Sequence, residues 1–132
     1  MSNSIISRDN LVIVAFKAIQ YFKIPLTKRS IEEQIKTHPD YPALKSVTDT
    51  LDHFSIKNYP VRVTQKEIAQ IDQPFLAYTH QHGEELQFVE KQSENGFAIR
   101  GNSKKKKVLS DKEFFSIFSQ PVFNPFLCIL PK

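Results

Sequence analysis

The hydrophobic pattern is strongest over residues 7–22, where apolar side chains fill nearly every face of a predicted helix for about three turns. After the first turn of this helix, Lys17 and Gln20 are the only clearly polar interruptions. Ser7 or Asp9 can cap its start. A helix that is apolar almost all round is a buried helix, and this one is too short to cross a bilayer. We therefore expect the other elements to pack around it.

Two shorter helices are predicted by apolar residues at helical spacing in residues 27–36 and 43–54. Each carries one apolar stripe and is otherwise polar, which is typical of helices that lie on the surface of a core. Thr27 and Ser30 can each cap the first of the two. Two prolines in the intervening segment separate the helices, because proline cannot continue a helix.

From residue 57 the apolar spacing changes from helical to alternating, which is the pattern of strands. Strands are predicted at residues 59–63, 75–79, 86–91, 96–100, 106–109 and 126–130, and short helices at residues 66–71 and 110–118. An Asn-Gly pair at residues 95–96 is typical of a hairpin turn. Helices followed by strands predict an α+β fold, with three N-terminal helices packed on a mainly antiparallel sheet of about five to six strands.

The length of 132 residues predicts a single domain over residues 1–132, with a helical half at residues 1–56 and a sheet half at residues 57–132. The single cysteine, Cys128, excludes an internal disulfide and fits a reducing compartment. It lies in an apolar run, so we expect an unreactive core side chain. No secretory signal pattern precedes the first helix. We therefore expect a cytoplasmic location.

The histidines are interpreted as structural residues. His38 precedes a proline at a helix end, and we expect it to cap that end. His80 and His82 lie close to the carboxylates of Glu84 and Glu85, but no distant third ligand is identifiable. We therefore expect a solvated loop at this place, with no metal site and no cofactor.

A basic run, Lys104, Lys105, Lys106 and Lys107, lies in a predicted hairpin of a chain whose net charge is +4. Such a run is usually solvated. The alternative is contact with anionic lipid, at about 1 kcal/mol per lysine, which would place the domain at the cytosolic face of a membrane. No aromatic residues alternate with the lysines as in a stacking platform. Nucleic acid is therefore not an expected partner.

Beside these patterns, the order of elements and several stretches resemble the peptidase C39 family over roughly residues 9–130. The matching stretches are residues 38–47, 50–51, 54, 56–63, 73–78 and 110–114. Members of this family are papain-fold cysteine peptidase domains at the cytosolic N-terminus of bacteriocin-exporting ABC transporters. The form His-Pro-Asp-Tyr-Pro at residues 38–42 especially resembles a C39-like domain fused to bacterial vitamin K epoxide reductase homologues with a thioredoxin-like module. The resemblance implies a papain-like fold with a cleft between its two halves.

The resemblance also implies a catalytic cysteine at the start of the first helix, where unpaired N–H groups and the helix dipole lower the pKa of a thiol. Asp9 matches the family's Asp-Cys-Gly step, but Asn10 stands in place of the cysteine. The position of the family's histidine falls on Glu85 or the two residues after it, and that of its aspartate on Gly101 and Asn102. A cysteine peptidase needs a thiolate and a base. All three catalytic positions are therefore predicted to be vacant, which argues against an enzyme.

The leading hypothesis is a non-catalytic C39 domain that binds a peptide or protein segment for a membrane-bound exporter or thiol oxidoreductase. Asp9, Asn10, Tyr41 and Tyr78 are the candidate contact residues. A purely structural interpretation, in which the tyrosines close the core, stays open beside it. Two alternative functions also remain. The first is an active C39-type cysteine peptidase that processes leader peptides with catalytic groups at other residues. The second is a structural regulatory domain of a fused membrane protein.

Overall fold

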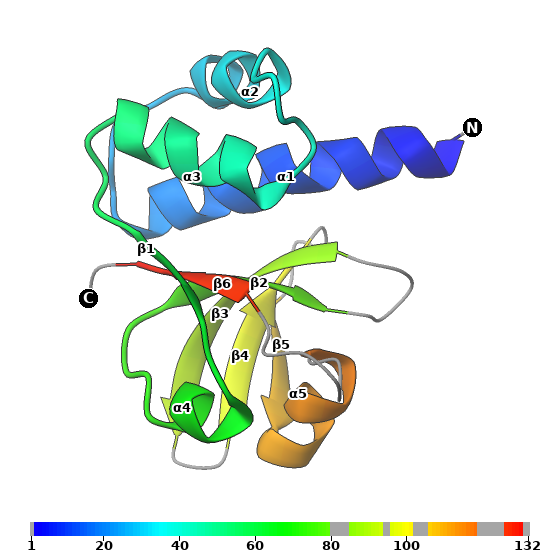
Figure 1. The fold of residues 1–132 in the computed structure, drawn as a ribbon, viewed down its shortest axis with the longest axis vertical. Helices are drawn as coiled ribbons and strands as arrows, with labels where there is room; N and C mark the ends of the chain where they lie inside the picture. Colours follow the sequence, from blue (N-terminus) through cyan, green and yellow to red (C-terminus); the bar gives the residue numbers. More distant parts are fainter. Residues whose placement is uncertain (1, 80–84, 94–95, 102–105, 119–125, 131–132) are drawn as a thin grey trace.

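The computed structural model describes residues 2–79, 85–93, 96–101, 106–118 and 126–130 (Figure 1). Its elements in chain order are α1 (Ser2–Tyr21), α2 (Lys28–Lys36), α3 (Leu44–His53), β1 (Tyr59–Arg62), α4 (Gln65–Ala69), β2 (Phe75–Thr79), β3 (Glu85–Ser93), β4 (Gly96–Arg100), β5 (Lys107–Ser110), α5 (Asp111–Phe118) and β6 (Phe126–Ile129). Within the described ranges, no helix has the length and apolar character needed to span a membrane. The predicted α+β order is confirmed.

The strands form one six-stranded sheet in the order β1-β6-β2-β3-β4-β5. All neighbouring strands are antiparallel. The last strand, β6, lies between β1 and β2, so that Ile129 is opposite both Tyr59 and Phe75. Strands β2 to β5 follow one another as a meander. The predicted mainly antiparallel sheet is thus confirmed.

Helices cover both faces of this sheet. Figure 1 shows α1, α2 and α3 on one side of the sheet, with α4 and α5 on the other. The alternation of side chains along β2 explains how both faces become apolar, because Leu76 packs with the N-terminal helices whereas Phe75 and Ala77 pack with α4 and α5. The α1-side core contains Leu11, Val12, Val14, Ala15, Ala18, Ile19, Ile31, Ile35, Leu44, Val47, Leu51, Ile56, Leu76, Leu86, Phe88, Cys128 and Leu130. The α5-side core contains Val63, Ile68, Ile71, Phe75, Ala77, Val89, Phe97, Ile99, Leu109 and Phe114.

The start of α1 differs from the prediction. The helix begins at Ser2, so its predicted start at Ser7 or Asp9 is wrong. No proline or glycine precedes Asn10, and the helix therefore continues toward the N-terminus. Asn10 consequently lies about two turns into the helix rather than at its first turn. Unpaired N–H groups and the positive dipole end act only over the first turn, so they do not reach this residue.

Helix α2 begins as predicted from one of its two candidate caps. The Oγ1 atom of Thr27 accepts a hydrogen bond from the N–H of Ser30 at 3.1 Å. Ser30 itself lies inside the helix, so the alternative cap is wrong. With α2 fixed in this way, Ile31 and Ile35 are buried in the α1-side core.

Candidate functional site

Asn10 joins α1 directly to the beginning of β3. Its Nδ2 donates a hydrogen bond to the carbonyl oxygen of Leu86 at 3.1 Å, and its Oδ1 accepts one from the N–H of Leu86 at 2.6 Å. The carboxamide therefore pairs with the main chain of β3 as a neighbouring strand would. Asn10 is only 1% exposed, so these two bonds are made away from water. The residue at the expected cysteine position is a buried structural contact between the two halves of the fold.

The side chain that faces α1 at this point of β3 is that of Leu86. Leu86 is opposite Tyr78 and belongs to the α1-side core. Its neighbours Glu85 and Gln87 are opposite Thr79 and Ala77, and Ala77 belongs to the α5-side core. Because successive side chains of a strand point to opposite faces, Glu85 and Gln87 point away from α1. The three residues at the expected histidine position thus place a hydrocarbon side chain, and no base, opposite Asn10.

Gly101 follows β4 and contacts α1 through its backbone. The Lys17 ammonium donates a hydrogen bond to the carbonyl oxygen of Gly101. A Cβ atom added at Gly101 would collide with the carboxamide of Gln87. A carboxylate side chain at this position would therefore require the end of Gln87 to move. The following residue, Asn102, lies outside the described residues.

Two of the candidate contact residues, Tyr41 and Tyr78, lie where the turn after α2 meets the end of β2. Both are partly buried and pack against the α1-side core. The Tyr78 hydroxyl donates a long hydrogen bond of 3.5 Å to the carbonyl oxygen of Pro42, the residue after Tyr41. Since Tyr78 is also opposite Leu86 in the sheet, the structure brings Asn10, Tyr78 and the Tyr41–Pro42 turn to one place. The backbone of Asp9, the fourth candidate, lies next to them in α1, and its side chain is outside the described part of the chain.

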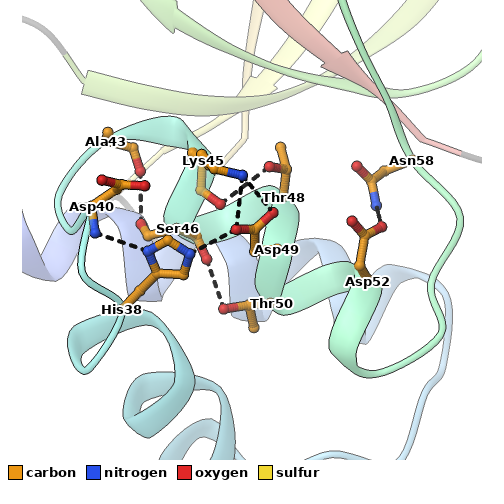
Figure 2. Close-up of polar contacts among 10 residues, drawn as sticks. All are labelled: His38, Asp40, Ala43, Lys45, Ser46, Thr48, Asp49, Thr50, Asp52 and Asn58. Carbon is orange, nitrogen blue, oxygen red and sulfur yellow. Dashed lines mark hydrogen bonds and ion pairs between the residues drawn. The ribbon is translucent and has the colours of Figure 1, made fainter.

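His38 holds this turn against α3 instead of capping α2, so the capping prediction is wrong (Figure 2). Its Nδ1 accepts a hydrogen bond from the N–H of Asp40 at 2.9 Å, and this donor fixes the tautomer. The proton of the neutral ring then lies on Nε2, which contacts Asp49 Oδ2 at 2.7 Å. The hydrogen bonds from His38 and then from Lys45 lower the pKa of Asp49. Both ring nitrogens are thus occupied, and His38 is not available as a base.

Cys128 is a core residue, as predicted. It lies in β6, has no exposed surface and donates a hydrogen bond to Asn58 Oδ1 at 3.5 Å. Burial raises the pKa of its thiol to about 12. A thiol with this pKa is almost entirely protonated at neutral pH and is a weak nucleophile. Cys128 is therefore unsuited to the role of a catalytic nucleophile.

The remaining predicted sites fall largely on residues that the structure does not describe. His80, His82 and Glu84 lie outside the described residues, as do Lys104 and Lys105. Among the side chains that are described, no three His, Cys, Asp or Glu residues are grouped so as to hold a metal ion. Lys106 and Lys107 are exposed.

The sequence interpretation missed a polar pocket beside the contact between Lys17 and Gly101. A pocket of about 380 Å³ is lined by Lys17, Gln20, Tyr21 and Arg100. The signal was present in α1, because Lys17 and Gln20 interrupt an otherwise apolar helix. Nothing in the sequence indicated that Arg100 lies beside them.

Comparison with known proteins identifies relatives for this arrangement. The sequence model of the peptidase C39 family matches residues 7–124. The peptidase domain of Streptococcus ComA, a bifunctional ABC transporter involved in a quorum sensing pathway, has a TM-score of 0.72 at 13% identity, and the match covers 95% of this chain and 93% of that one. A double glycine motif protease from an AMS/PCAT transporter, solved in complex with the leader peptide, has a TM-score of 0.73 at 10% identity, with 92% and 84% covered. None of the curated protein sequences matches the chain.

Proposed function

The chain belongs to the peptidase C39 family, and from this premise we propose that it is a non-catalytic member that binds a peptide or protein segment. Residues 1–132 then act as one domain, with a helical half at residues 1–56 and a sheet half at residues 57–132. Its partner is a membrane-associated protein, either an exporter or a thiol oxidoreductase of the vitamin K epoxide reductase type. The domain works at the cytosolic face of that membrane.

The observation that carries this proposal is the pair of hydrogen bonds between Asn10 and Leu86. Peptide cleavage by a cysteine requires a thiolate and a neighbouring base. At the equivalent place this chain has an amide that bonds to the main chain of β3, and a leucine side chain that faces α1. Neither group transfers a proton or attacks a carbonyl. The contact instead fastens α1 to the sheet.

Two observations support a peptide as the ligand. The double glycine motif protease, which shares the fold, was solved with its leader peptide. Next to the Asn10–Leu86 contact, Tyr41 and Tyr78 keep part of their surface accessible. Aromatic side chains with a polar tip are frequent anchors in peptide interfaces. In this proposal the two tyrosines contact the ligand, while Asp9 and Asn10 shape the surface between them and β3.

The proposal is tested by titrating the ¹⁵N-labelled domain with double-glycine leader peptides. We expect saturable amide shifts around Tyr78, Leu86 and Asn10. Tyr78→Ala should weaken binding by about tenfold or more, the effect of removing an aromatic anchor. Tyr59→Ala is the matched control, because Tyr59 lies on edge strand β1 and is 56% exposed. A folded domain that responds to none of the peptides, or equal weakening by both substitutions, would contradict peptide binding at this place.

A second experiment tests the alternative of an active peptidase. Fluorogenic double-glycine peptides are incubated with the domain, with and without a thiol alkylator. We expect no turnover in either case, since Cys128 is buried and its pKa is raised to about 12. Turnover that the alkylator abolishes would overturn the non-catalytic assignment. A regulatory domain without peptide binding would be indicated if deletion changed the activity of the partner while no peptide bound.

A further inference from the structure

The polar pocket lies between the second half of α1 and the β3–β4 pair. Lys17, Gln20 and Tyr21 line it from α1, and Arg100 lines it from the end of β4. Asn10 and Lys17 are seven residues apart, close to two helical turns, so they lie on the same side of α1, about 10 Å apart along its axis. The pocket is therefore a neighbour of the Asn10 contact and separate from it.

Contacts with the surrounding elements hold the two cations of the pocket in place. The Arg100 guanidinium forms an ion pair with Glu90 of β3. It also lies over the rings of Tyr21 and Phe88, at 5.9 Å and 5.8 Å from their centroids. The Lys17 ammonium bonds to the carbonyl oxygen of Gly101. Cations held in this way lose little side-chain freedom when a ligand binds, which favours binding.

The two cations lie close enough to repel each other. Burial lowers the pKa of Lys17, and the positive charge of Arg100 lowers it further. The hydrogen bond to Glu90 raises the pKa of Tyr21, so the ring carries no negative charge at neutral pH. An anion between Lys17 and Arg100 would relieve the repulsion.

We propose that this pocket binds a carboxylate group between Lys17 and Arg100, with the side-chain amide of Gln20 as a further donor. The charges of the described side chains around the pocket favour a monoanion. Among the described side chains, the two cations that line the pocket, Lys17 and Arg100, and Glu90, which pairs with Arg100, have a net charge of +1. A carboxylate neutralises this charge, whereas a doubly charged phosphate exceeds it and is repelled by Glu90.

The natural source of the carboxylate is the bound peptide, and in this respect the inference rests on the proposed function. About three residues of extended chain cover the roughly 10 Å between the levels of Asn10 and Lys17. The pocket would then select peptides that carry a carboxylate at that distance. The carboxylate belongs either to an Asp or Glu side chain or to the C-terminus of the peptide.

Acetate is the simplest probe, because it tests the pocket without any peptide. The ¹⁵N-labelled domain is titrated with sodium acetate, and sodium chloride at the same ionic strength is the reference. We expect saturable shifts of the Gln20 side-chain amide and the Arg100 Nε–H that chloride does not produce. The peptides Ac-Gly-Glu-Gly-NH₂ and Ac-Gly-Gly-Gly-OH then separate a side-chain source from a C-terminal source, with Ac-Gly-Gly-Gly-NH₂ as the blank.

Three variants test whether acetate binds in this pocket. Gln20→Glu places a carboxylate one turn from Lys17 without removing a cation, and it should weaken acetate binding about fivefold or more by occupying the site. Lys17→Gln should weaken acetate binding by a similar factor. Lys66→Gln on α4 makes the same change in net charge on the opposite side of the sheet, and it should leave acetate binding within about twofold. If Lys17→Gln proves unfolded, Gln20→Glu alone still decides.

Several results would overturn the inference. These are the absence of saturable acetate shifts, equal weakening by Lys66→Gln, and phosphate binding at least tenfold tighter than acetate. The two proposals fail separately. Leader peptides that shift amides around Asn10 while acetate leaves the pocket unchanged would overturn the carboxylate site alone. Acetate binding in a domain that no leader peptide perturbs would overturn the peptide-binding function alone.

Discussion

Two places on one side of α1 contact the sheet in opposite ways. At Asn10 the helix meets β3 through a neutral amide that is 1% exposed and bonds twice to Leu86. Two turns further along, Lys17 and Arg100 line an open pocket with charged groups. The first contact is closed to water, whereas the second is open to it. Asn10, at the position expected for the cysteine, thus lies in the structural core, whereas Lys17 on the same helix lies at an accessible place.

This difference follows from what each environment requires of a polar group. A buried amide is stable only when its donors and its acceptor are satisfied. The charged pair beside α1 keeps contact with solvent and needs no complete set of partners. Substitutions at the two places should therefore differ in cost.

The largest effect is expected at the buried contact. Asn10→Leu leaves the N–H and the carbonyl of Leu86 without their side-chain partners away from water. We expect the free energy of unfolding to fall by about 3 kcal/mol, since each unsatisfied buried group costs about 1–3 kcal/mol. Chemical denaturation monitored by circular dichroism measures the change.

The matched control for this substitution is Asn58→Leu. Asn58 also bonds through its amide, to Asp52 Oδ1 and to the carbonyl oxygen of Ile56, but it is only partly buried. Water can replace the two bonds that its Nδ2 donates, and the bond that its Oδ1 accepts from the buried Cys128 thiol is weak. We therefore expect a loss of about 1 kcal/mol or less. Equal losses in the two variants would show that burial does not distinguish the contacts.

At the pocket on the same side of α1, Lys17→Met should lower the free energy of unfolding by less than Asn10→Leu does. The substitution keeps most of the apolar stem and removes the hydrogen bond to Gly101. It also relieves the repulsion by Arg100. We expect the free energy of unfolding to fall by about 1 kcal/mol, as measured by the same denaturation experiment. A loss as large as that of Asn10→Leu would mean that this contact is as important to stability as the buried one.

Gly101→Ala tests the space at the expected aspartate position. The added methyl group collides with the end of Gln87, a flexible group, while the lower entropy of the unfolded chain favours alanine by about 0.4–1 kcal/mol. We expect a net loss below about 1 kcal/mol. In a Gln87→Ala background the collision is absent, so the same substitution should be neutral or stabilising. If the free energy of unfolding falls equally in that background, the cost of the alanine would come from the backbone of residue 101 and not from the Gln87 side chain.

The smallest effect is a shift in the titration of Lys17. Burial and Arg100 hold its pKa below 10.5 in the folded state. Between that folded pKa and about 10.5 the unfolded chain binds more protons, so this residue makes the free energy of unfolding rise with pH in that window. Arg100→Gln should raise the pKa of Lys17, although burial should still keep it below 10.5. The Lys17 ¹³Cε chemical shift followed against pH measures the pKa of Lys17 in the native domain and in the variant. An unchanged pKa in the variant would show that the charge of Arg100 does not act on Lys17.

Local patterns were sufficient to predict the order of the elements. Apolar spacing identified the three helices and the strands, and the resemblance to the C39 family was sufficient for the papain-like fold. The predicted start of α1 was wrong because Ser7 and Asp9 are good N-caps but are also tolerated inside a helix when no helix-breaking residue precedes them. Such a choice depends on the whole segment rather than on one residue.

The site was only partly predictable, because its contacts are long-range. The resemblance to the family led us to expect Asn10 at the position of the cysteine, but the pairing of Asn10 with Leu86 depends on how α1 is placed over β3. The bond between His38 and Asp49 likewise depends on the angle at which the turn meets α3. The proximity of Arg100 to Lys17 depends on the register of β4 against β3. None of these depends on local spacing.

The place of β6 in the sheet sets an order of events during synthesis. Among the described strands, β1 pairs only with β6, and residues 63–125 separate the two strands in the chain. On the ribosome, β1 must therefore wait with an unpaired edge until the segment that contains β6 has left the exit tunnel. Such a late, distant closure slows folding and exposes an edge to other chains. A nascent chain that stalls before β6 emerges would be a natural client for chaperones.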